Sequence, residues 1–178
     1  MQFQITRNSL YTNYKVNKFK PNISPICSYC LSDPDTLNPE SELISHLFSS
    51  CIKVASFWQE LQHWLATLGT FLPTEKNKIL FGVHEEPATS VLNVIIMYAK
   101  QFIWRSKFGS KSLEISLFHK FLFSKLTDLK NALLFSEKLI EFDKWINIFD
   151  CMSVLPVCSA QTVASVPATD SPTADQTA

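Results

Sequence analysis

Three cysteines and one histidine lie between residues 27 and 51 with the spacing C-x2-C-x15-H-x4-C. The four residues are Cys27, Cys30, His46 and Cys51. Sulfur and imidazole nitrogen are ligands that zinc prefers, and four of them form a closed tetrahedral site without hydrolytic chemistry. The intervening loop adds little cost, because the entropy of loop closure grows only logarithmically with length. The spacing therefore predicts a structural zinc ion that contributes folding free energy.

The same residues are compatible with a second interpretation that involves no metal. The cysteines would then be small buried hydrophobic side chains, and His46 would be a histidine at a helix end. A disulfide framework is not expected, because the chain has an odd number of cysteines and no secretory features. Cys151 and Cys158 have no matching histidine pair and are interpreted as incidental.

The hydrophobic pattern predicts a mainly α fold class with a helical bundle. The spacing of the four ligands places a small CCHC knuckle before this bundle. The clearest predicted helix is capped by Ser50 and ends before Gly69. Its apolar residues recur at i, i+3, i+4 and i+7, and they are Val54, Phe57, Trp58, Leu61, Trp64, Leu65 and Leu68. The only strand-like alternation, Phe3-Gln4-Ile5-Thr6, is short.

Four further elements are predicted from caps and periodicity. They are a short helix starting at Asn38-Pro39-Glu40 and running through His46, a short element from Pro73 to Gly82, a helix over 89–108, and a long helix that is capped by Ser112 and continues through Trp145.

From residue 151 onwards the chain is rich in Ser, Thr, Ala and Pro and lacks aromatic residues, which predicts a disordered tail. We therefore expect one domain over 1–150, with its knuckle at 27–51 and its helical part at 52–150, followed by the tail at 151–178. The longest apolar run, residues 91–99, is too short to span a bilayer. Because the N-terminus also lacks the apolar region of a signal peptide, an intracellular location and no membrane partner are expected.

The formal net charge is zero, but the charges are unevenly distributed. Residues 1–32 contain four basic residues and no acid, and residues 33–42 contain four acids and no base. Residues 100–130 contain seven basic residues against two acids. Basic segments beside a metal site could contact phosphates, although solvated helix faces would explain the same pattern. The candidates for phosphate contact are Arg7, Lys15, Lys18, Lys20, Lys100, Arg105 and Lys107.

Several motifs follow one another in a recognisable order. The run C27-S-Y-C30 … H46-L-F-S-S-C51 precedes Phe57-Trp58 and Trp64-Leu65, then Ile79-Leu80-Phe81-Gly82, then Asn93 … Ala99-Lys100 … Ile103 … Arg105. Upstream lie Arg7, Leu10 and Thr12-Asn13. In this order, over residues 5–149, the chain resembles the zinc-binding region C-terminal to reverse transcriptases of non-LTR (LINE-like) retrotransposons.

The resemblance implies a CCHC zinc site and a module that holds template RNA or target DNA during target-primed reverse transcription. Tyr29, in the knuckle turn, would either stack on a base or cover the knuckle. The chain departs from the family pattern by an acidic extension, DPDTLNPESE, between the cysteine pair and the histidine.

No enzymatic activity is expected. Polymerase chemistry needs clustered carboxylates to hold two divalent cations, and the chain contains neither a paired-aspartate polymerase motif nor an endonuclease constellation. His84 beside Glu85 and Glu86 is more simply interpreted as part of a charged loop.

A different class of function is a helical protein–protein interaction domain without nucleic-acid binding. Its partner would be a reverse transcriptase core or a second copy of the chain. The supporting feature is a long helix with phenylalanines on more than one face, namely Phe118, Phe121, Phe123 and Phe135.

Overall fold

The computed structural model describes residues 2–34, 36–83, 89–109 and 112–135, together with Trp145, Ile146, Ile148 and Asp150. Over these residues the fold is mainly helical, as predicted, and its one strand-like feature is an isolated antiparallel bridge between Ile26 and Ser41. The helices are α1 (Gln2–Thr6), α2 (Asn13–Asn17), α3 (Ser28–Leu31), the π-helix η1 (His46–Ser50), α4 (Ile52–Thr67), α5 (Lys76–Phe81), α6 (Thr89–Gly109) and α7 (Ile115–Phe135). The predicted tail at 151–178 lies outside the described residues.

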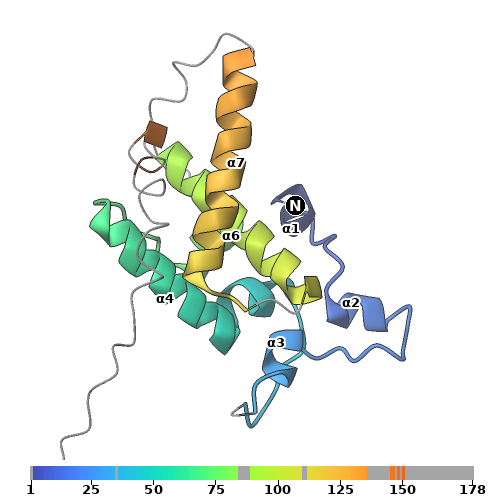
Figure 1. Ribbon diagram of the computed structural model, residues 1–178. Coiled ribbons are helices and arrows are strands. Elements are labelled where there is room, and N and C mark those ends of the chain that lie inside the picture. The colour runs from blue at the N-terminus through green and yellow to red at the C-terminus, as the bar shows by residue number, and fades with distance from the viewer. Residues whose placement is uncertain are drawn as a thin grey trace, which may run out of the picture.

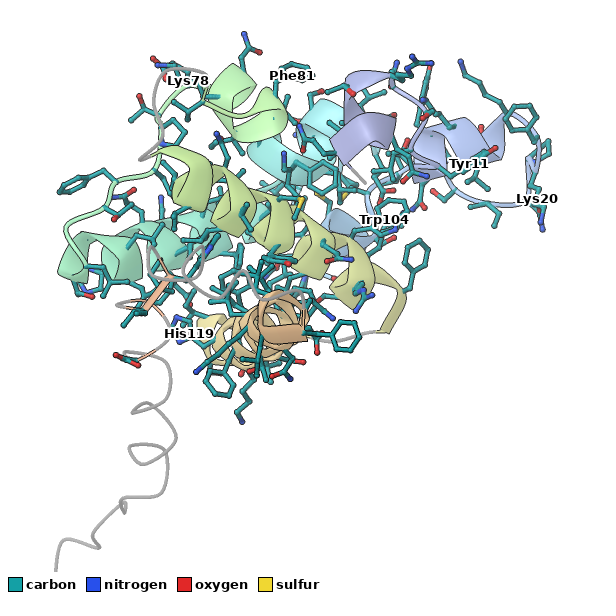
Figure 2. All side chains as sticks on the ribbon, turned by 90° about the horizontal axis from the view of Figure 1, so that it is seen from above. Tyr11, Lys20, Lys78, Phe81, Trp104 and His119 are labelled. Carbon is teal, nitrogen blue, oxygen red and sulfur yellow. The ribbon has the colours of Figure 1, made fainter. Side chains whose placement is uncertain are left out.

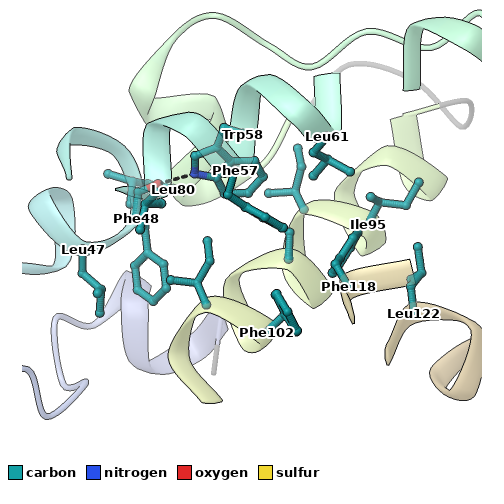
Figure 3. Close-up of a cluster of buried hydrophobic side chains, with 14 of the residues drawn as sticks. Leu47, Phe48, Phe57, Trp58, Leu61, Leu80, Ile95, Phe102, Phe118 and Leu122 are labelled. Carbon is teal, nitrogen blue, oxygen red and sulfur yellow. Dashed lines mark hydrogen bonds between the residues drawn. The ribbon is translucent and has the colours of Figure 1, made fainter. Parts of the chain in front are cut away.

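The three long helices α4, α6 and α7 cross one another and form the body of the protein, with α1 and α2 at one side (Figure 1). At their crossing each contributes one buried phenylalanine: Phe57, Phe102 and Phe118 (Figure 3). The ring centroids are 5.5–5.7 Å apart, and Phe118 meets Phe57 edge to face. Aromatic pairs at such separations contribute about 0.5–1.5 kcal/mol beyond their buried area, so this cluster fixes how the helices cross.

The predicted buried face of α4 is confirmed. On α4 the buried residues are Val54, Phe57, Trp58, Leu61 and Leu65, all of them predicted. Gly69 follows this helix with a φ of +69°, the left-handed conformation expected of a C′ glycine. The helix predicted over 89–108 is α6, and the short element predicted before Gly82 is α5.

Several predicted boundaries were wrong. No helix starts at Asn38, because the backbone N–H of Cys27 donates to Glu40 (2.9 Å) and that of Glu42 donates to Pro25 (2.8 Å), which keeps the segment extended. Residue 51, not Ser50, is the N-cap of α4.

The N-terminal segment and the long helix α7 also differ from their predictions. The alternating residues Phe3–Thr6 lie in helix α1. The long helix α7 begins at Ile115, three positions after the predicted cap Ser112. Its predicted continuation through Leu139, Ile140 and Phe142 lies outside the described residues.

Lys100 is an interior residue, 1% exposed, and not a phosphate contact as predicted. Its ammonium group donates to the backbone carbonyl of Leu80 at the end of α5 (2.9 Å) and to the side chain of Gln2 on α1. Burial lowers the pKa of Lys100 to about 8. The residue therefore joins α1, α5 and α6 inside the protein, where its amine is enclosed and out of reach of a ligand on the surface.

Asn93 on α6 makes a second connection to the end of α5. Its amide accepts from the backbone N–H of Val83 and donates to the carbonyl of the same residue, both at 2.7 Å. Gly82 turns the chain toward Asn93 with a φ of +98°, which L side chains rarely adopt. The segments 79–82 and 93–100, two of the motifs noted in the sequence, thus form one packed unit.

Among the described residues, no helix is both long and apolar enough to cross a membrane.

Candidate metal centre

Two helix starts bring the predicted ligands together. Cys27 is the N-cap of α3 and Cys30 lies within that helix. His46 opens η1, and Cys51 both ends η1 and caps α4. All four side chains are buried, and their ligand atoms lie within 4.8 Å of one another. The four residues that the spacing predicted therefore form one group that could hold a metal ion.

The distances fit a tetrahedral ion. Sγ of Cys51 lies 3.9 Å from Sγ of Cys27 and 3.8 Å from Sγ of Cys30. Around a tetrahedral ion with metal–sulfur bonds of about 2.3 Å, two sulfurs are about 3.8 Å apart. Nε2 of His46 lies 3.3 Å from Sγ of Cys30, within a few tenths of an ångström of the corresponding sulfur–nitrogen separation.

Backbone amides near all three sulfurs act to lower the pKa of the thiols. They belong to Tyr29 and Cys30 for Cys27, to Glu40 for Cys30, and to Lys53 and Val54 at the start of α4 for Cys51. The hydrogen bond between Cys27 and Cys51 raises the pKa of the first thiol and lowers that of the second, and burial raises the pKa of Cys30. Amide donors stabilise thiolates, which are the ligand form of cysteine.

A carboxylate orients the histidine. Nδ1 of His46 lies 3.0 Å from Oε2 of Glu40. Because a carboxylate only accepts, Nδ1 carries the proton and Nε2 is left to face the sulfurs. Metal-binding histidines commonly have such a partner on the second ring nitrogen. Glu40 was assigned to the acidic extension by sequence and not to the site, although an acid six positions before the histidine was a usable signal.

Glu42 is the second functional residue that sequence reasoning missed. Its carboxylate is fully buried and accepts hydrogen bonds from the backbone N–H of Asn13 (2.8 Å) and of Ser28 (3.4 Å), and it also pairs with the ammonium of Lys107. It thereby connects α2, the cysteine turn and α6. Together with Glu40 it shows that the acidic extension supports the centre instead of distorting it.

Lys107 is the second correction to the predicted phosphate contacts. Its side chain is 3% exposed, and its charge is neutralised by Glu42. A buried ammonium paired in this way is unavailable to a nucleic-acid phosphate. Lys100 and Lys107 on α6 therefore have structural roles, whereas Arg105 on the same helix is exposed.

Tyr29 connects the ligand turn to α6, and its predicted stacking on a base stays a prediction. Its hydroxyl donates to the backbone carbonyl of Ile103 on α6 (2.7 Å), and its half-buried ring packs against the core. Burial raises the pKa of Tyr29. The residue therefore joins the knuckle to the helical body.

The remaining predicted contacts lie in three parts of the chain. Lys15, Lys18 and Lys20 belong to α2 and the turn after it, where Lys18 and Lys20 are exposed and Lys15 is half-buried. Arg105 is exposed on α6 with its guanidinium 5.6 Å from the ring centroid of Phe121. Arg7 is exposed in the turn after α1.

Comparisons of the chain with protein-family models, with curated proteins and with solved structures give no match. Function is therefore inferred from the geometry of the centre, from the charge distribution and from the resemblance in sequence.

Proposed function

We propose that this chain is a non-catalytic, zinc-stabilised module that binds nucleic acid, similar to the C-terminal region of a LINE-like reverse transcriptase. The observation that carries the proposal is the convergence of three sulfurs and one imidazole nitrogen within 4.8 Å, in the order that the resemblance implies.

Zinc is the ion that suits this ligand set best. Three thiolates and an imidazole in a tetrahedron are typical of structural zinc sites, whereas magnesium and calcium require oxygen ligands. With four protein ligands, the ion has no open position for a reacting water, which agrees with a structural and not a hydrolytic role.

The alternative of metal-free buried cysteines explains less of the geometry. Buried thiols need no imidazole nitrogen directed at them, no carboxylate behind that imidazole and no amide donors on the sulfurs. Here Glu40 orients His46, and backbone amides bond to Cys27 and Cys51. All three features support a centre arranged for a cation.

The nucleic-acid part of the proposal is supported by charge. Residues 2–32 contain four basic residues and no acid, and this segment leads directly into the ligand turn at Cys27. Lysines near a phosphate backbone release condensed counterions, so affinity should fall steeply with salt.

The test is a salt titration of the zinc-loaded full chain with labelled RNA and DNA oligonucleotides, in single-stranded and duplex forms. The expected result is binding to at least one of them whose log affinity falls linearly with log salt concentration. Binding that is absent, or that stays constant with ionic strength, would refute the nucleic-acid function while leaving the metal centre in place.

Two of the phenylalanines that favoured a protein–protein interaction domain are packed inside the protein. Phe118 is buried between α4 and α6, and Phe121 packs against Tyr98 and Phe102, so these residues serve the protein's own core. Phe135 is still 93% exposed. Sedimentation of the zinc-loaded chain tests the interaction-domain alternative, since self-association through exposed residues such as Phe135 would appear as a concentration-dependent dimer.

A further inference from the structure

Large aromatic side chains are exposed around α2. Tyr11 is 65% exposed and Phe19 is 77% exposed, and Tyr14 between them is also exposed. We call Tyr11, Tyr14, Lys15, Lys18, Phe19 and Lys20 the α2 surface. Figure 2 shows Tyr11 and Lys20 at the edge of the molecule, away from the crossing of the long helices. Single exposed apolar residues are ordinary, but three aromatic rings on one short segment favour a binding role.

The lysines of the α2 surface have no acidic partner in the described part of the chain. Lys15, Lys18 and Lys20 form no ion pair there, and Lys18 lies 4.8 Å from the ring centroid of Tyr14. Glu42 does contact this region through Asn13, but its charge is neutralised by Lys107. The α2 surface therefore presents uncompensated positive charge together with aromatic rings.

A hollow of about 380 Å³ lies on this surface, lined by Tyr11, Val16, Phe19 and Lys20. Its walls are largely apolar, and the basic residue Lys20 is one of the residues that line it. A nucleotide in a single strand has matching chemistry, since its base offers an apolar face and its phosphate a negative charge. Bases in a duplex are already stacked on their neighbours and cannot enter such a hollow, so a single strand fits and a duplex does not.

An anionic membrane is a poorer match to the same residues. Interfacial helices carry a continuous apolar face over several turns. The helix α2 has five residues, and the apolar residues here are separated by lysines and asparagines. Exposed rings that alternate with lysines thus favour a nucleic-acid strand over a membrane.

The α2 surface is held rigidly against the knuckle. The side-chain amide of Asn13 donates to the carbonyl of Ile26 (2.9 Å) and to the hydroxyl of Ser28 (3.0 Å), beside Cys27. Asn17 closes the following turn by donating to the carbonyl of Ile23 (2.8 Å), and this turn carries Phe19 and Lys20. A preordered surface loses less conformational entropy on binding. The α2 surface is thereby connected to the segment that carries the metal ligand Cys27.

We propose that the α2 surface binds single-stranded RNA or DNA, with Tyr11 and Phe19 stacking on bases and Lys15, Lys18 and Lys20 contacting phosphates. This inference rests on the proposed nucleic-acid function and adds the form of the strand and the place where it binds.

The experiment measures fluorescence anisotropy of the zinc-loaded full chain with an oligouridylate and an oligothymidylate of about 12 nucleotides, and with a blunt duplex of the same length. Phe19→Leu keeps an apolar side chain but removes the stacking ring, and should weaken single-strand binding about tenfold. Phe19→Trp should retain it. Phe71→Leu is the matched control, because Phe71 is similarly exposed (66%) but lies outside the α2 surface. Lys20→Gln should reduce the salt slope by about one, and Lys120→Gln on α7 should not.

The outcomes separate this inference from the function on which it rests. Wild-type binding that is salt-dependent but unaffected by Phe19→Leu, or equally strong for the duplex, overturns the α2 assignment and leaves the nucleic-acid function standing. Wild-type chain that binds no oligonucleotide overturns both. Binding to vesicles containing phosphatidylserine, lost in Phe19→Leu, without binding to oligonucleotides, identifies a membrane surface instead and also overturns the inference. Circular dichroism and metal content equal to wild type exclude misfolding of the variants.

Discussion

Glu42→Gln should be among the most destabilising single changes in this protein. The Glu42 carboxylate is fully buried, and its two oxygens accept from different backbone amides, Oε1 from Asn13 and Oε2 from Ser28. Glutamine has only one such oxygen, so it leaves one amide without its acceptor, and it also removes the charge that faces the buried ammonium of Lys107. Breaking a buried ion pair by removing one partner costs about 3–5 kcal/mol, because the other charge is left unpaired. That is a large part of the stability of a typical domain.

The assay is urea unfolding at a constant zinc concentration, followed by circular dichroism, for Glu42→Gln, Lys107→Met and the double variant. The double variant should be more stable than the sum of the single losses predicts, by about 0.5–3 kcal/mol, because it leaves no unpaired charge. Asp128→Asn is the control, since its pair with Lys125 (2.8 Å) is exposed and contributes at most about 1 kcal/mol. A Glu42→Gln loss no larger than that of Asp128→Asn, or strict additivity in the double variant, would refute the reasoning.

Three further predictions concern other parts of the structure. Glu40→Gln removes the carboxylate behind the metal-facing histidine and should weaken zinc affinity about 10–100-fold in competition with a chelator; an unchanged affinity would contradict the orienting role. Gly82→Ala places a Cβ 3.0 Å from Oδ1 of Asn93 at a φ of +98°, and it should lower the free energy of unfolding by up to about 3 kcal/mol in thermal denaturation. Gly69→Ala, which has open space around it, should lower it by about 1 kcal/mol, and a larger loss for Gly69→Ala than for Gly82→Ala would contradict this. Burial lowers the pKa of Lys100 from 10.5 to about 8, so between these pH values the unfolded chain holds a proton that the folded chain has released. The free energy of unfolding should therefore rise with pH from about 8 to 10.5, and Lys100→Met should lack this rise. Identical pH profiles of the wild type and Lys100→Met would refute the prediction.

The parts of the fold that followed from sequence are those set by local pattern. On α4 the apolar residues recur with helical spacing, and the five buried ones were all predicted. The four ligands were also recognisable, because the chemistry of sulfur and imidazole is specific and their spacing is typical of metal sites. Ligand type and helical period are both visible in one short window of sequence.

The misassigned residues are those whose roles depend on partners distant along the chain. Lys107 and Glu42 are 65 positions apart, and nothing local indicates that they meet. Lysines are almost never fully buried unless paired, so assigning Lys100 and Lys107 to the surface was the natural expectation. The predicted helix at Asn38 was wrong for the same reason, since its capping signals were outweighed by backbone hydrogen bonds of Glu40 and Glu42 to Cys27 and Pro25.

The metal content of the purified full chain, prepared under reducing conditions without chelator, tests the central claim most directly. We predict a single zinc ion per chain, with three sulfurs and one nitrogen in its X-ray absorption spectrum. Cys27→Ser and Cys51→Ser should each lose most of this zinc, and Cys158→Ser, in the tail outside the described residues, should keep it. A folded wild-type chain that contains no metal and binds none when zinc is supplied would contradict the account.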